Sequence, residues 1–185
     1  MTKFTESELK KFDKQDKRLN DFKQKAFDLG VAMCSADVFR KETLQGHRMT
    51  SGDRAEIVMS FMLGFFKKLT ELDDWGELRV TFSPFLDRKK VDFVLTRFGW
   101  DHKIQLKFND LRKYILPRGV HLVRSAPSRK FRDKNFMGKT DRGDNVLLEF
   151  LVQGDAYSES ELYDFFDEHE DFAAICCEVW EMIHD

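Results

Sequence analysis

The chain has 185 residues with a net charge of −2, and 42% of its residues are hydrophobic, including 19 Phe. This length and composition indicate one domain that has a sizeable hydrophobic core and some additional segments around it. No apolar run approaches the roughly 18 residues of a membrane span, and the first residues, MTKFTESELKKFDK, lack the apolar segment of a secretory signal. The three cysteines fit neither a disulfide framework nor a zinc spacing. We therefore expect a cytoplasmic protein with no membrane association.

The net charge hides an asymmetry between the two parts of the chain. Residues 143–185 contain 13 Asp and Glu but no Lys or Arg, so residues 1–142 hold all 31 basic residues and only 20 acidic ones. Such a split is a hint that the basic part binds a polyanion.

Two helices are predicted before the main body. A capping-box pattern of Thr5 and Glu8 opens an amphipathic helix over residues 5–29, which Gly30 is expected to end. A second helix is predicted over residues 36–44 and ends at Gly46. Together they form an N-terminal helical extension over residues 1–50.

The next segment, residues 51–153, is predicted to be the core of the fold. A helix runs from the cap Ser51 to Leu72 and carries Glu56 in its first turn. Strands are expected over residues 78–83, 91–95, 104–108 and 119–124, with a turn at 84–87 and a short helix over 110–116. This order predicts an α/β (α+β) fold, a mixed sheet with helices against it.

The strands at 91–95 and 104–108 are predicted to form a hairpin around which the chain is organised. Because side chains alternate along a strand, Ile104, Leu106 and Phe108 face the core while Gln105 and Lys107 face the other way. The same alternation puts Asp92 on the face opposite the core. A carboxylate, a carboxamide and an ammonium group thus share one side of the hairpin.

A basic segment follows the last strand, and residues 125–142 form a loop with few aliphatic residues. Two Phe residues lie among its charges, which suits contact with phosphates and stacking on bases. A solvated loop anchored by the two Phe residues explains the pattern equally well. The candidate nucleic-acid-binding residues are Arg124, Arg129, Lys130, Arg132, Lys134, Lys139 and Arg142.

The acidic C-terminal region, residues 154–185, is predicted to be helical and to pack on the same domain. Residues 145–152 before it are apolar enough for a buried strand or a short helix. Ser158 and Glu161 form a second capping box, which opens a helix ending near His169, and a terminal helix covers residues 172–183. The acidic surface serves for solubility, for covering the basic region, or for a protein partner.

Most familiar catalytic patterns are missing. There is no Gly-x-Gly-x-x-Gly, no Gly-x-Ser-x-Gly and no metal-ligand spacing of histidines. The remaining constellation is Glu56, Asp92, Gln105 and Lys107. Carboxylates at the ends of a helix and a strand suit Mg²⁺, which polarises a phosphodiester and activates water, and a nearby Lys stabilises the transition state.

These residues resemble the PD-(D/E)xK nuclease superfamily, with similarity to archaeal-type Holliday-junction resolvases and Mrr-like restriction enzymes over residues 51–124. The resemblance implies a restriction-endonuclease-like αβββαβ core and cleavage of DNA that depends on Mg²⁺ or Mn²⁺. It makes Glu56, Asp92, Gln105 and Lys107 catalytic, with Glu56, Asp92 and the Leu106 carbonyl as metal ligands. Gln105 replaces the usual carboxylate, which removes one charge from the metal site.

Three further interpretations stay open at this point. One is a catalytically inactive nuclease fold, and another is an unrelated interaction protein of the immunity or inhibitor type. The third is a nucleic-acid-binding module without chemistry. A homodimer and a protein partner for residues 154–185 are likewise open.

Overall fold

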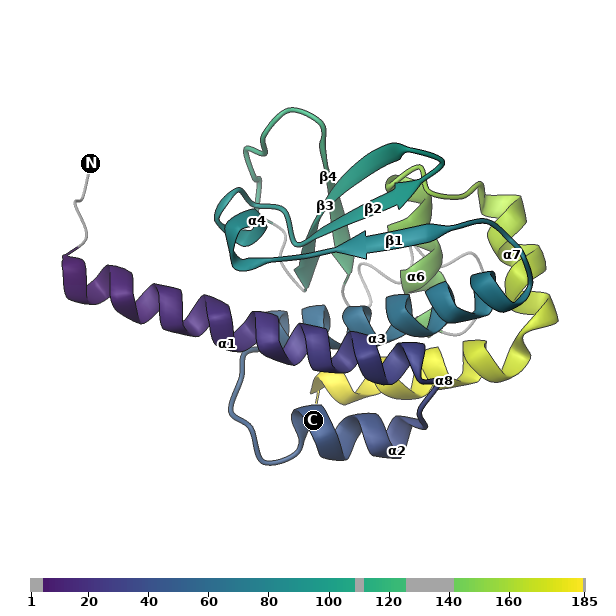
Figure 1. The fold of residues 1–185 in the computed structure, drawn as a ribbon, viewed down its shortest axis with the longest axis horizontal. Coiled ribbons are helices and arrows are strands. Elements are labelled where there is room, and N and C mark those ends of the chain that lie inside the picture. Colours follow the sequence, from purple (N-terminus) through teal and green to yellow (C-terminus); the bar gives the residue numbers. More distant parts are fainter. Residues whose placement is uncertain (1–4, 109–111, 126–141, 185) are drawn as a thin grey trace.

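The computed structural model describes residues 5–108, 112–125 and 142–184 (Figure 1). Among them, no helix is both long and apolar enough to cross a membrane. In chain order the elements are α1 (Glu6–Val31), α2 (Ala36–Phe39), the π-helical segment η1 (Arg40–Leu44), α3 (Ser51–Leu72), β1 (Leu78–Thr81), α4 (Pro84–Arg88), β2 (Phe93–Arg97), β3 (Trp100–Phe108), β4 (Val120–Ser125), α6 (Arg142–Gln153), α7 (Glu159–Glu168), α8 (Glu170–Glu181) and the 3₁₀ turn η2 (Met182–His184).

The four strands form one mixed sheet in the order β1-β2-β3-β4. β1 pairs with β2, and β2 with β3, in antiparallel fashion, whereas β4 runs parallel to β3. The predicted hairpin is confirmed, but its strands reach further, because Arg97 pairs directly with Trp100. The two turn residues, Phe98 and Gly99, have positive φ angles of 51° and 79°, as a type I′ turn requires. His102 therefore lies within β3.

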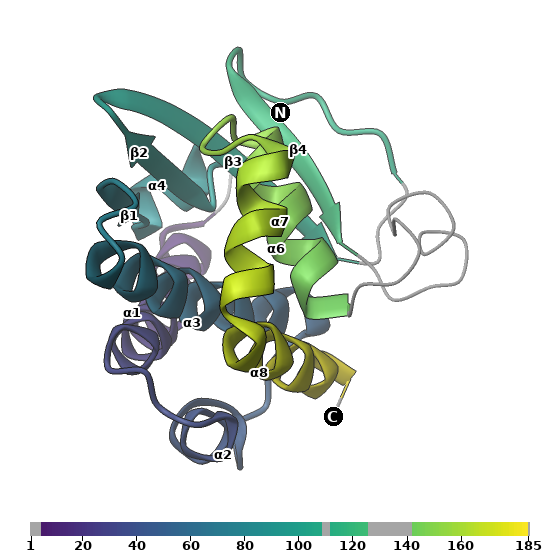
Figure 2. The same ribbon diagram turned by 90° about the vertical axis from the view of Figure 1, so that its right-hand side faces the viewer.

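The helices gather on one side of the sheet, and the fold is a mixed α/β structure (Figures 1 and 2). α3 and α6 lie next to the strands, and α2 and α8 lie further from them. Of the β3 residues predicted to face the core, Ile104 and Leu106 are buried together with Phe93, Leu95 and residues of α3 and α6, and Phe108 packs against this core but is only partly buried. The alternation read from the sequence thus places the correct face inward.

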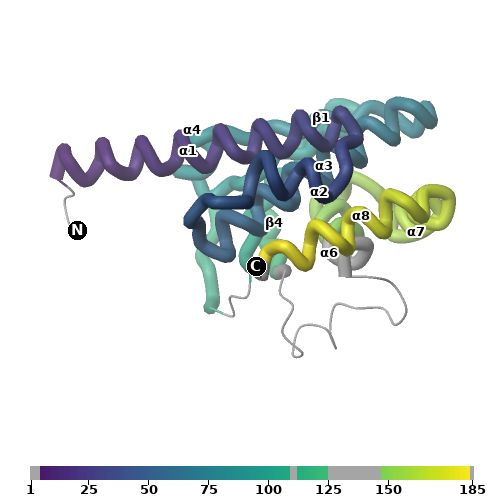
Figure 3. Tube along the Cα trace, turned by 90° about the horizontal axis from the view of Figure 1, so that it is seen from below, coloured from purple at the N-terminus to yellow at the C-terminus, as the bar shows by residue number. Residues whose placement is uncertain are grey.

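α1 and α3 run side by side, while the first turns of α1 extend beyond the rest of the protein (Figure 3). The helices approach closely at two glycines. A Cβ atom on Gly30 would lie 2.2 Å from the Phe61 carbonyl oxygen, and one on Gly64 would lie 2.3 Å from the Phe27 carbonyl oxygen. The prediction that Gly30 ends the helix is wrong, because α1 continues to Val31. Gly30 instead permits backbone contact with α3.

The C-terminal helices pack into the same hydrophobic core as the sheet and α3. Residues 145–152 lie in the helix α6, which resolves the alternative of strand or helix. Trp75 stacks on Tyr157 with ring centroids 5.0 Å apart, and Phe66 packs edge-on against both Tyr157 and Phe165. Phe165 and Trp180 are almost completely buried. The two predicted capping boxes are both present, at Thr5–Glu8 and Ser158–Glu161.

The connection from β3 to β4 differs from the prediction. The helix expected over residues 110–116 is absent from its described part, residues 112–116, which have no regular structure. Two of their carbonyl oxygens accept hydrogen bonds from side chains. The Arg124 side chain donates to the Arg112 carbonyl oxygen at 2.7 Å, and Lys90 Nζ donates to the Ile115 carbonyl oxygen at 3.5 Å. Pro117 also disfavours a helical conformation for the residue before it.

Candidate metal centre

The structure brings two of the predicted carboxylates together at one end of the sheet. Glu56 lies in the second turn of α3, one turn later than predicted, and Asp92 lies directly before β2. Oxygen atoms of Glu56, Asp87 and Asp92 all lie within 4.8 Å of one another. Lys107 lies further along β3, and its charge acts on both Glu56 and Asp92.

Asp92 is held in a fixed orientation by the neighbouring strand. Its side chain is 5% exposed, and Oδ2 accepts hydrogen bonds from Gln105 Nε2 and from the Leu106 backbone N–H, both at 2.6 Å. Gln105 is therefore a positioning partner of Asp92, which explains why a neutral side chain is suitable there. The N–H and C=O of one strand residue point to the same side, so the Leu106 carbonyl is directed toward Asp92. Its role as a metal ligand stays a prediction.

Asp87 is a third carboxylate that the sequence reasoning missed. Residues 84–87 were predicted to form a turn but belong to the short helix α4, which Ser83 caps and Pro84 begins. A Ser-Pro pair followed by an acidic residue is a signal for such a helix start. Asp87 Oδ1 is buried and accepts no hydrogen bond in the described structure. Lys23 Nζ lies 3.8 Å from this oxygen, beyond hydrogen-bond distance, so the oxygen would be available as a ligand for a cation.

Lys23 of α1 is the second residue that was missed. Its side chain is fully buried, and Nζ lies 3.1 Å from Glu56 Oε2, 3.8 Å from Asp87 Oδ1 and 2.9 Å from the Asp92 carbonyl oxygen. Nζ also lies 4.2 Å from the centre of the Phe93 ring. A signal was present in the sequence, because Lys23 interrupts the apolar face of residues 5–29 at helical spacing.

Burial raises the pKa of all three carboxyl groups. The rise is large for Asp92, whose pKa is raised further by repulsion from Glu56, and burial brings the pKa of Asp87 to about 6. The pKa of Glu56 is also raised by burial, although Lys23 opposes this rise. Lys23 supplies one ammonium group beside these three carboxyl groups. Three carboxylate oxygens at this spacing fit a hard divalent cation such as Mg²⁺ or Mn²⁺.

A cluster of basic groups borders the carboxylates. The Tyr114 ring lies 4.9 Å from Lys107 Nζ, 5.7 Å from the Arg112 guanidinium carbon and 5.8 Å from that of Arg124. Arg124 is the predicted nucleic-acid-binding residue whose side chain the structure describes. Arg142 begins α6, but its side chain lies outside the described residues, as do the five residues Arg129, Lys130, Arg132, Lys134 and Lys139.

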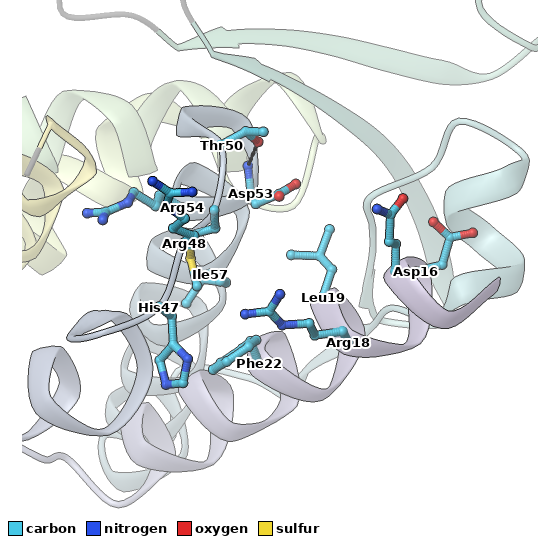
Figure 4. Close-up of a pocket in the computed structure, with 12 residues that line it drawn as sticks. Asp16, Arg18, Leu19, Phe22, His47, Arg48, Thr50, Asp53, Arg54 and Ile57 are labelled. Carbon is cyan, nitrogen blue, oxygen red and sulfur yellow. Dashed lines mark hydrogen bonds between the residues drawn. The ribbon is translucent and has the colours of Figure 1, made fainter. Parts of the chain in front are cut away.

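A groove of about 710 Å³ lies beside the carboxylates, between α1, residues 47–50 and the start of α3. Figure 4 shows Arg18 extending from α1 into the groove, with Arg48 and Arg54 on the opposite wall. Two further lining residues connect the groove to the carboxylates, because Asp53 acts electrostatically on Glu56 and Asp16 acts on Asp87. These arginines were not predicted as binding residues.

A second acidic group lies at the surface. Asp73, Glu168 and His169 also approach within 4.8 Å of one another. His169 pairs with Asp73, and the two acids are exposed, so an ion pair accounts for this group.

Comparisons with known proteins identify no relative. No family model matches the chain, and no curated protein and no solved structure matches it.

Proposed function

We propose that the protein is a metal-dependent nuclease that hydrolyses phosphodiester bonds, with DNA as its substrate. The observation that carries this proposal is the convergence of Glu56, Asp87 and Asp92, from three different elements, beside Gln105 and Lys107. The order of one helix, three antiparallel strands and a fourth strand parallel to the third supports a restriction-endonuclease-like core. The irregular residues 112–119 depart from the helix that this core has between its last two strands.

Each residue has a role that follows from its position. Glu56, Asp87 and Asp92 would hold Mg²⁺ or Mn²⁺, which when bound polarises the phosphodiester and lowers the pKa of water. Gln105 keeps Asp92 in place through its 2.6 Å hydrogen bond. Lys107, beside the carboxylates, stabilises negative charge that develops on the phosphate oxygens.

The protein offers a substrate strand two basic surfaces next to this site. On one side are Arg112 and Arg124 beside Tyr114, and on the other is the groove with Arg18, Arg48 and Arg54. An affinity that depends on phosphate contacts falls as the salt concentration rises. A plot of the logarithm of the binding constant against the logarithm of the salt concentration has a slope of about −0.9 for each neutralised phosphate on duplex DNA. The double variant Arg18→Ala/Arg48→Ala should therefore reduce the slope by nearly two, whereas Arg79→Ala on the exposed end of β1 should not. Fluorescence anisotropy of a labelled duplex in EDTA measures both.

Lys107→Ala tests the chemical part of the proposal. We expect loss of cleavage by at least about a hundredfold, as for removal of one charge-stabilising group, with DNA affinity nearly unchanged. Lys103→Ala is the matched control, because Lys103 is an exposed lysine on the same face of β3. Cleavage of plasmid and of branched, linear and single-stranded DNA at equal rates by Lys107→Ala and the wild type would rule out a nuclease centred on this site.

A second candidate is the same fold without catalysis, used for binding. The observation that favours it is Lys23, which already supplies a cation to the carboxylates. This candidate predicts DNA or protein binding that is unaffected by Mn²⁺ and no cleavage of any substrate. Deleting residues 155–185 is not a clean test for a protein partner, because Phe165 and Trp180 belong to the core. Charge-reversal variants of exposed acidic residues in α7 and α8 test that partner without unfolding the protein.

A further inference from the structure

We propose that the Lys23 ammonium group holds the place of the metal in the metal-free protein and is displaced from the carboxylates when the metal binds. This inference rests on the metal site of the proposed function and concerns its regulation. It makes Lys23 an internal competitor of the metal and not only a structural ion-pair partner.

The position of Lys23 is that of a cation shared by several oxygen ligands. Its Nζ is within 4 Å of carboxylate oxygens of Glu56 and Asp87, and it donates a 2.9 Å hydrogen bond to the Asp92 carbonyl. The side chain is fully buried and has no access to water. Ammonium and metal would therefore both use the Glu56 and Asp87 carboxylates, and we expect the two cations to compete for them.

The displaced ammonium would keep other partners. Nζ lies 4.2 Å from the Phe93 ring centre and 5.2 Å from that of Phe82, and aromatic faces attract a cation. A metal held by the carboxylates would not occupy these rings or the Asp92 carbonyl, so they would remain available to the ammonium group. A small movement of a flexible four-carbon side chain is therefore sufficient, without expelling the charge into solvent.

Charge balance gives the direction of the effect. Three ionised carboxylates carry a charge of −3, so one ammonium group leaves −2 and one divalent cation leaves −1. The divalent cation therefore offsets more of this charge than Lys23 does. With the metal present, Lys23 then becomes a like charge beside it. Removing the ammonium should raise metal affinity, by at least about tenfold for unit charges a few ångströms apart in a partly buried site.

A purely structural ion pair gives the opposite expectation. If Lys23 only fixes α1 on α3 and orients Glu56, removing it should disorder a ligand and weaken metal binding. Lower stability alone does not separate the two cases, because both leave buried carboxylates without their partner. Metal affinity does separate them.

The experiment is calorimetric titration of MnCl₂ into the wild type, Lys23→Met and Lys25→Met. Lys25 is the matched control, since it lies on the same helix, half exposed, and pairs with Glu42 at 3.0 Å. Lys23→Gln serves as a second variant if Lys23→Met does not fold, and thermal melting with and without Mn²⁺ is the second readout. We expect at least about tenfold tighter binding and a larger Mn²⁺-induced rise in Tm for the Lys23 variants only.

Three other results are informative. Equal or weaker binding by the Lys23 variants overturns the inference but leaves the proposed nuclease intact. No binding to any of the proteins overturns both. Tighter binding by the Lys23 variants without cleavage of DNA by the wild type supports the inference and counts against the proposed function.

Discussion

The hydrogen bond between Gln105 and Asp92 offers the sharpest test of how the site is built. Gln105→Glu replaces the amide donor with a carboxyl group at nearly the same size, next to the buried Asp92 carboxylate. In the metal-free protein we expect a loss of folding free energy. The hydrogen bond is 2.6 Å long, and its two residues are 4% and 5% exposed.

The size of the loss follows from these contacts. A hydrogen bond to a charged acceptor contributes about 1.5–3 kcal/mol. Two carboxylates at this distance do not both ionise, so one of the two carboxyl groups must stay protonated at neutral pH, where its O–H can still donate a hydrogen bond to the other. Keeping it protonated costs about 1.4 kcal/mol for each pH step of one above its ordinary pKa. We therefore expect a loss of about 2–4 kcal/mol at pH 7 in EDTA and a smaller loss near pH 5. Mn²⁺ should recover much of it, because the new carboxylate is an additional ligand.

Urea denaturation in EDTA, repeated with Mn²⁺, measures these differences. Gln24→Glu is the matched control, because Gln24 Nε2 donates to Asp28 Oδ1 at 2.9 Å on the exposed surface of α1. An exposed helical pair of this kind contributes about 0.2–0.5 kcal/mol. Equal losses for Gln105→Glu and Gln24→Glu would refute the argument that Gln105 positions a buried carboxylate.

Two further predictions concern the protein outside the site. Gly30→Ala should destabilise the protein by about 1–3 kcal/mol through overpacking against α3. Gly52→Ala should not, because its Cβ would make only an ordinary contact, 3.7 Å from Thr50 Oγ1. Thermal melting compares the two variants, and equal Tm values would contradict the close helix contact. Burial raises the pKa of Glu149 from 4.5 to about 7. The folded state then binds a proton that the unfolded state releases, so Glu149 contributes stability at low pH that is lost between about pH 4.5 and 7. Glu149→Gln should remove this loss in urea denaturation at several pH values, and parallel pH profiles for the two proteins would contradict it.

The elements set by local interactions were largely predictable. Capping boxes at Thr5 and Ser158 marked two helix starts, because side-chain and backbone partners only three residues apart decide them. Alternation in β3 gave the faces of Gln105 and Lys107. The prediction failed where distant partners decide the conformation. Gly30 looked like a helix end, but its role depends on α3, and residues 112–116 lose their helix to side chains from other segments.

The sequence by itself therefore determined the helices with capping boxes, the hairpin and the shared face of Asp92 and Gln105, since these depend on spacing and on side-chain alternation. Only the tertiary structure decided that Asp87 and Lys23 join Glu56. Lys23 and Glu56 are 33 residues apart, and their contact depends on the close approach of α1 to α3. Electrostatic interactions decide whether a buried carboxylate pairs with a lysine or binds a metal, and these interactions depend on which charges the folded chain brings within a few ångströms.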